Sequence, residues 1–214
     1  MKFLIFFFLS LSIAASAQLY KFDYMLKSEN TRDDAKYNHT SFDMINSNDH
    51  TYYMNVGSNS VTGMYRSLLF DHSKKELYIF YINNRKMVSP LLFTFKGVGV
   101  YNDRQFLRYN DLQIVKIGNH RYRIIGKSKK KSKKNEIEII LELEPHTNDL
   151  LLFNFEPLTS LQQQEIITLL KNTLKSENES GNFYIKEITF HYFKDSLFQQ
   201  KITPVKIDVN LNIQ

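Results

Sequence analysis

Apolar and polar residues alternate with a period of two over most of the chain, a pattern typical of β-strands with one buried face. Near the start, one predicted face carries four large residues: Tyr20, Phe22, Tyr24 and Leu26. The last strand alternates most strictly, and its predicted inward residues are Val205, Ile207, Val209, Leu211 and Ile213. The pattern predicts about eleven to twelve strands joined mainly by short turns.

Turn sequences group many of these strands into hairpins. The predicted hairpin strands are, in order, 42–46 with 51–56, 64–71 with 76–82, and 113–117 with 120–126. Gly118-Asn119 is the two-residue turn signal of the third hairpin. The two glycines of 97–99 indicate a flexible or bulged turn. Further strands are expected at 91–96, 136–144, 150–155, 183–193 and 205–213.

The period changes after Pro157, where the sequence predicts one helix over about 159–176. Thr159 and Ser160 are both N-cap residue types, and each is followed three positions later by a glutamine, as in a capping box. The apolar residues then recur with helical spacing and form one stripe, made of Ile166, Ile167, Leu170 and Leu174. This stripe predicts that the helix docks on the sheet.

Many short strands and a single amphipathic helix define the expected fold class. An antiparallel meander must protect its edge strands, either by closing on itself or by a covering element. We therefore expect a mainly β protein, with a curved or partly closed antiparallel sheet or barrel and the helix packed on it.

Residues 1–17 have the features of a secretory signal peptide. Lys2 precedes an apolar run from Phe3 to Ile13, which is shorter than the roughly 20 residues that a membrane-spanning helix needs. Ala15-Ser16-Ala17 then supplies the small residues that signal peptidase accepts. We predict cleavage after Ala17, a single β-rich domain over 18–214, and export to the periplasm or the extracellular space of a bacterium.

The chain contains no cysteine. An exported protein of this kind has no disulfides, so its stability depends on packing. The same absence excludes a thiol nucleophile, a cysteine-ligated zinc site and an iron–sulfur cluster.

Positive charge is concentrated in one predicted hairpin loop, which we call the lysine loop: Lys127, Lys129, Lys130, Lys131, Lys133 and Lys134. The formal net charge of the whole chain is +6, so the rest of the mature chain is nearly neutral. Each lysine near an anionic surface contributes about 1 kcal/mol, which makes an anionic membrane surface or a polysaccharide a candidate partner. The simpler interpretation is a solubilising hairpin tip. Nucleic acid is not expected, because no aromatic residue interleaves with the lysines to stack on bases.

No residue pattern indicates catalysis, a metal site or a cofactor. The six histidines lack the i, i+2 or i, i+4 spacing that brings two imidazoles to one metal. A serine-hydrolase elbow, a phosphate-binding loop, a zinc-protease motif and a calcium loop are all absent from the sequence. We therefore assign no catalytic, cofactor-binding or metal-binding residue.

Aromatic residues are abundant, with 13 tyrosines and 17 phenylalanines. In strands, such residues mostly pack in the core and across neighbouring strands. In a curved sheet they can also line a cavity for a hydrophobic small molecule. The two interpretations remain open at this point.

The first third of the chain resembles a group of uncharacterised exported β-rich proteins of Bacteroidota. The resemblance lies in the opening Phe22-Asp23-Tyr24 and in the run Ser41-Phe42, Asn46-Ser47, Tyr52-Tyr53, Asp71 and Phe80. It implies an envelope or secreted location and carries no activity or functional residue.

These observations favour a non-enzymatic exported envelope protein that acts as a binding or interaction module, with an apolar ligand cavity as one form of it. One alternative is a hydrolase whose carboxylates meet only in the fold. Another is adhesion to an anionic surface through the lysine loop. A cleft with paired acidic or histidine side chains would favour the hydrolase, and a continuous apolar lining would favour the binding module.

Overall fold

A computed structural model describes residues 18–58, 65–82, 92–100, 109–128, 136–155, 158–192 and 196–213. They form one antiparallel sheet of eleven strands, a short 3-10 helix η1 (Ala35–Tyr37) and one α-helix, α2 (Ser160–Ser176). The strands are β1 (Gln18–Arg32), β2 (His39–Asn46), β3 (Asp49–Ser58), β4 (Tyr65–Asp71), β5 (Glu76–Ile82), β6 (Phe93–Val100), β7 (Tyr109–Gly118), β8 (Arg121–Ser128), β9 (Glu136–His146), β10 (Asn182–Tyr192) and β11 (Ser196–Ile213).

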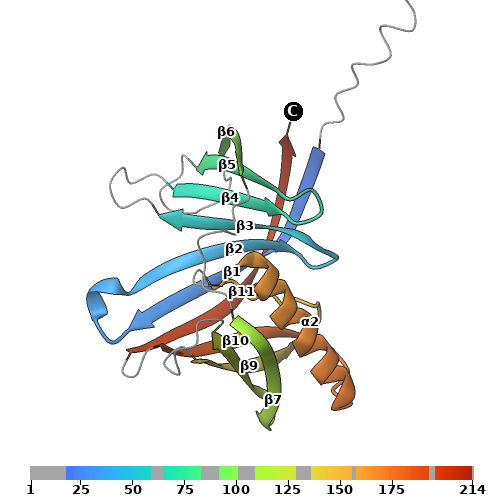
Figure 1. Ribbon diagram of the computed structural model, residues 1–214. Coiled ribbons are helices and arrows are strands. Elements are labelled where there is room, and N and C mark those ends of the chain that lie inside the picture. Colours follow the sequence, from blue (N-terminus) through green and yellow to red (C-terminus); the bar gives the residue numbers. More distant parts are fainter. Residues whose placement is uncertain are drawn as a thin grey trace, which may run out of the picture.

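Two meanders make up the sheet, in the order β6-β5-β4-β3-β2-β1-β11-β10-β9-β8-β7 (Figure 1). The pairing of β1 with β11 joins them and places Gln18 opposite Ile213. Across the described residues the sheet is not closed, since β6 and β7 are its two edges. The predicted antiparallel meander with one packed helix is therefore confirmed, in its open form.

The last strand contains a β-bulge, and one of its predicted inward residues is exposed. Phe22 pairs with Val209 and Tyr24 pairs with Lys206, so β11 has one extra residue at this point. Leu211 is buried, and Ile207, Val209 and Ile213 pack against the same core. Val205, which we also expected inward, lies opposite Met25 on this face but is 40% exposed.

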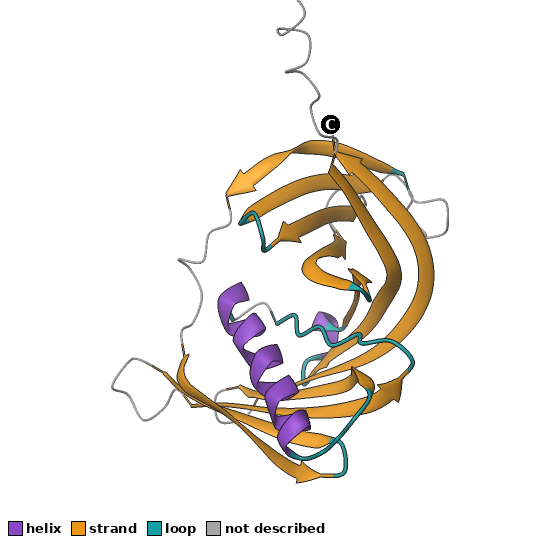
Figure 2. Ribbon diagram, turned by 90° about the vertical axis from the view of Figure 1, so that its right-hand side faces the viewer, coloured by secondary structure: helices purple, strands orange, loops and turns teal. Residues whose placement is uncertain are grey.

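Two hydrophobic cores lie on opposite faces of the central strands. Ile45 and Tyr53 belong to the core that includes α2, whereas the adjacent Met44 and Met54 belong to a second core in the first meander. Successive strand residues point to opposite faces, so β2 and β3 are covered on both sides. Figure 2 shows the sheet curving around α2. We call the α2-facing side of β1, β2, β3 and β11 the inner face.

The segment between β9 and α2 crosses this inner face as a loop, which we call the crossing loop (Figure 2). The strand predicted at 150–155 is wrong, because in the described part of this segment the only bridge joins Leu150 to Tyr184. Leu150 and Phe153 are nevertheless buried. The apolar run is therefore explained by side-chain packing and not by a strand ladder.

Two predicted turns are also corrected. Gly118 is the last residue of β7 and pairs with Arg121, so the turn consists of Asn119 and His120, with His120 at φ 50°. The region 97–99 lies inside β6, where Gly97 takes a φ of 153° at a bulge opposite Ile79 and Phe80. Glycine allows the bulge but does not end the strand.

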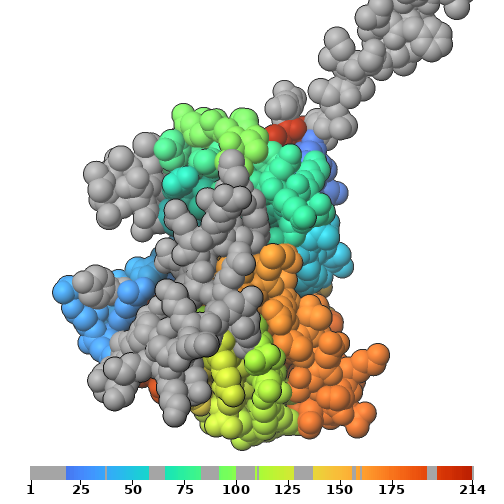
Figure 3. All heavy atoms as spheres, viewed as in Figure 1, coloured from blue at the N-terminus to red at the C-terminus, as the bar shows by residue number. Residues whose placement is uncertain are grey.

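The predicted helix is confirmed at both ends. Thr159 is the N-cap, and with Gln162 it forms a capping box. Of the predicted stripe, Ile166, Leu170 and Leu174 are buried. The other side of α2 is seen at the molecular surface, next to β7 (Figure 3). Within the described residues, no helix is long and apolar enough to span a bilayer.

Candidate functional site

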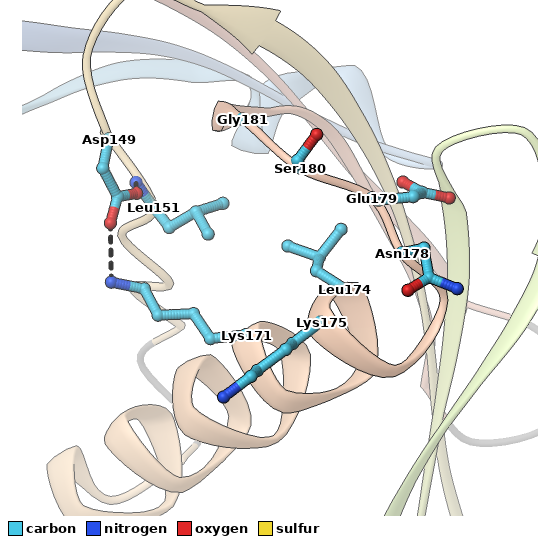
Figure 4. A pocket seen from close by; sticks show the side chains of 9 residues that line it. All are labelled: Asp149, Leu151, Lys171, Leu174, Lys175, Asn178, Glu179, Ser180 and Gly181. Atoms are coloured by element: carbon cyan, nitrogen blue, oxygen red, sulfur yellow. Dashed lines mark hydrogen bonds and ion pairs between the residues drawn. The ribbon is translucent and has the colours of Figure 1, made fainter.

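A cavity of about 410 Å³ lies at the C-terminal end of α2 (Figure 4). It is lined by charged and apolar side chains from α2, from the turn that follows it and from the crossing loop, among them Asp149, Leu151, Lys171, Leu174, Lys175 and Glu179. Leu151 and Leu174 are buried and point toward one another in its interior. Lys171 and Lys175 are four residues apart, so they occupy one face of the helix.

Asp149 is held by two basic groups on one side of the cavity. The Lys171 Nζ lies 2.7 Å from Asp149 Oδ2, and the His50 Nε2 lies 3.9 Å from the same oxygen. The backbone N–H of Leu151 donates to Asp149 Oδ1 at 3.2 Å. This carboxylate thus fixes the crossing loop to α2 and faces the start of β3.

Glu179 lies across the cavity from Asp149 and is also compensated by two basic groups. The turn after α2 places it there, since the Glu179 N–H donates to Leu174 O at 3.0 Å and Asn178 takes a positive φ of 56°. Lys116 forms an ion pair with Glu179, and His120 Nδ1 lies 3.1 Å from Glu179 Oε2. Burial raises the pKa of Glu179, but Lys116, Tyr122 and His120 together outweigh it, and the pKa is lowered overall.

Lys175 differs from these groups because it has no ion-pair partner among the residues that the structure describes. The cavity therefore presents two compensated carboxylates and one uncompensated ammonium group. This arrangement suits the binding of a small polar molecule with an anionic group.

A second unusual group is Asp43 on the inner face of β2. Its side chain is only 4% exposed, and Oδ1 accepts hydrogen bonds from Asn55 Nδ2 at 2.8 Å and Asn154 Nδ2 at 2.9 Å. Burial raises the pKa of Asp43 to about 6, although both hydrogen bonds oppose the shift. Asn154 belongs to the crossing loop, so Asp43 also ties that loop to the sheet.

The structure gives only partial information on the predicted lysine loop. Lys127 is exposed and lies near the end of β8. The other five lysines, Lys129, Lys130, Lys131, Lys133 and Lys134, lie outside the described residues, as does the predicted signal peptide 1–17. Over the described part of the chain, no group of three or more His, Asp or Glu residues could hold a metal ion.

Sequence reasoning missed Asp43, Asp149 and Glu179. For Asp43 a signal existed, since the strand alternation of 42–46 places it on the same face as Ile45. Asp149 and Glu179 are 30 positions apart and meet their basic partners only in the fold. No spacing in the sequence could have identified them.

Comparison of the chain with protein-family models, with curated proteins and with solved structures finds no match. The function therefore has to be inferred from the site itself, and the resemblance to exported Bacteroidota proteins stays a prediction.

Proposed function

We propose that this chain is an exported binding module, not an enzyme, and that it binds a small anionic or zwitterionic molecule in the cavity at the end of α2. One observation carries the proposal: both carboxylates of this cavity are compensated by fixed basic groups, while Lys175 is not. The volume of about 410 Å³ is within the range of about 300–1,000 Å³ that small-molecule sites occupy.

The charges of the cavity favour binding over hydrolysis. A general acid or base works best when its pKa lies near the working pH. The lowered pKa of Glu179 keeps that group ionised at neutral pH. Asp43 has a pKa of about 6, but it is buried against two asparagines of neighbouring segments and is not part of the cavity lining.

The apolar ligand expected from the aromatic content stays a prediction, and so does adhesion through the lysine loop. The cavity interior offers Leu151 and Leu174 as a small apolar contact beside the charges. A ligand with a short apolar body and a charged group would match both features.

The proposal is tested by exposing purified protein to a mixture of small anionic metabolites and identifying retained compounds by mass spectrometry after dialysis. We expect at least one compound to be enriched by the wild type and lost from the Lys175→Gln variant. Lys206→Gln is the matched control, because it removes one exposed ammonium group from β11. The proposal would be contradicted if the wild type retained no compound, or if both variants lost the compound to the same extent.

A further inference from the structure

Each of the two carboxylates that line the α2 cavity contacts one lysine and one histidine. His120 Nδ1 lies 3.1 Å from Glu179 Oε2, and His50 Nε2 lies 3.9 Å from Asp149 Oδ2. Lysines stay charged at neutral pH, whereas histidine is the side chain whose charge changes between about pH 5 and pH 8. The two histidines therefore make the charge around this cavity depend on pH.

Two acidic groups after the C-terminal end of α2 share one lysine. Lys116 Nζ lies 3.6 Å from Glu177 Oε2 and also forms the ion pair with Glu179. The pKa of Glu179 is lowered, so this carboxylate remains ionised in mild acid. One positive charge thus faces two negative charges on this side of the cavity, and a proton on His120 removes the excess negative charge.

Two aromatic side chains of the sheet also face this pair, and neither adds a charge. The Phe183 ring of β10 lies 5.3 Å from the His120 ring, centroid to centroid. Tyr122 of β8 faces Glu179, but burial raises the pKa of Tyr122, so its hydroxyl stays neutral. The charge of His120 is therefore set against Glu179 and Lys116.

The other side of the cavity is already balanced by a lysine. Lys171 Nζ lies 2.7 Å from Asp149 Oδ2, so a proton on His50 adds a positive charge that this carboxylate does not offset. With Lys175 included, three ammonium groups and three carboxylates lie in and around the cavity. The two histidines thus decide whether this group of charges is neutral or positive.

We propose that His50 and His120 form a pH switch for the α2 cavity, which binds its anionic ligand more tightly in mild acid and releases it as the pH rises. This inference rests on the proposed function, because it concerns the same ligand and the same cavity. One added charge about 6–8 Å from an anion in a water-like medium changes the affinity by about threefold, and two such charges by nearly tenfold.

The test is a titration of ¹⁵N-labelled protein with propane-1-sulfonate at pH 5.5 and at pH 8, at constant ionic strength. This anion has a short apolar body, and its charge is the same at both pH values. We expect saturable chemical-shift changes in residues 171–181, and an affinity roughly threefold to tenfold higher at pH 5.5 than at pH 8.

A double variant assigns the effect to the two histidines. His50→Gln combined with His120→Asn removes both titrating groups, and asparagine suits the positive φ of 50° at position 120. This variant should bind with the wild-type affinity at pH 8 and should lose the gain at pH 5.5. His191→Gln is the matched control, because it removes one exposed histidine from β10, and it should keep the full gain.

The results separate this inference from the proposed function. Equal or weaker binding by the wild type at pH 5.5, or a gain that persists in the double variant, would overturn the pH switch and leave the cavity as a binding site. The absence of saturable changes at both pH values would contradict the cavity as an anion site, and the pH switch would be refuted with it.

Discussion

Two buried carboxyl groups, Asp43 and Asp71, have pKa values shifted in opposite directions because their hydrogen-bond partners differ. Asp43 receives two neutral amide donors on one oxygen, and burial dominates, which raises its pKa to about 6. Burial also raises the pKa of Asp71, but four donors from Ser73, the Lys74 backbone, Tyr20 and Gln18 together lower it. The two aspartates thus differ in the number of donors and in how strongly burial acts on the carboxylate.

Asp43→Asn should stabilise the protein at neutral pH. The folded protein binds a proton at Asp43 between the ordinary aspartate pKa near 3.8 and the raised value of about 6, so this group favours folding in acid and the benefit is lost as the pH rises through about 6. The variant should gain up to about 3 kcal/mol in the free energy of unfolding at pH 8 and little at pH 4. Urea melts at both pH values measure this, and a less stable variant at pH 8 would contradict it.

Asp71→Asn should have the opposite effect. A lowered pKa means that the ionised carboxylate stabilises the fold above the ordinary pKa, and this contribution is lost as the pH falls through the folded value. We expect a loss of about 2 kcal/mol or more at pH 7, because an amide cannot accept the same set of hydrogen bonds. The difference from the wild type in urea melts should shrink as the pH falls below the ordinary aspartate pKa of 3.8, and an unchanged difference in acid would argue against the assigned cause.

At the scale of elements, α2 depends on its apolar stripe for stability, since an isolated helix of this length is marginal in water. Leu170 is fully buried, so Leu170→Ala should cost about 2–5 kcal/mol. Leu161 lies on the same helix but is 65% exposed, so Leu161→Ala is the matched control and should stay within about 0.5 kcal/mol of the wild type. Denaturant melts that show equal effects would contradict the docking of α2 through this stripe.

The sequence was sufficient to predict elements whose signals are local. The capping box of Thr159 and the spacing of Ile166, Leu170 and Leu174 are contained within a few helical turns, and α2 was predicted within one residue of its observed start. Most hairpin strands were likewise predicted, because alternation and turn residues are local signals.

Features that depend on partner strands could not be predicted. The bulge in β11 exists only in the pairing of this strand with β1, and the 40% exposure of Val205 depends on which residues cover that face. The apolar run from Leu150 to Phe155 looks like a strand in sequence, and only the crossing geometry shows that packing buries it. The cavity was missed for the same reason, since Asp149 and Glu179 meet their partners through tertiary contacts.

At the scale of the whole molecule, the β1–β11 pairing joins the two meanders, and the chain is predicted to begin there after export. Gln18 pairs with Ile213, donates a hydrogen bond from Nε2 to Asp71 Oδ2 at 3.1 Å, and accepts one from Lys74. We predict cleavage after Ala17, so the intact mass of protein secreted from its host should match a start at Gln18, with or without loss of ammonia by cyclisation. A mass that retains residues 1–17 would refute the predicted export.

The charge distribution of the whole molecule gives the last prediction. If the lysine loop contacts an anionic surface, then replacing Lys129, Lys130, Lys131 and Lys133 with serine should weaken binding to anionic lipid vesicles. Binding of the wild type should also fade with salt, because the Debye length falls from about 10 Å at 0.1 M to about 3 Å at 1 M. The matched control replaces four exposed lysines outside the loop with serine: Lys21, Lys96, Lys201 and Lys206. This control has the same net charge as the loop variant. Vesicle sedimentation at low salt decides the matter: equal binding by both variants and the wild type would leave the loop as a solubilising hairpin tip.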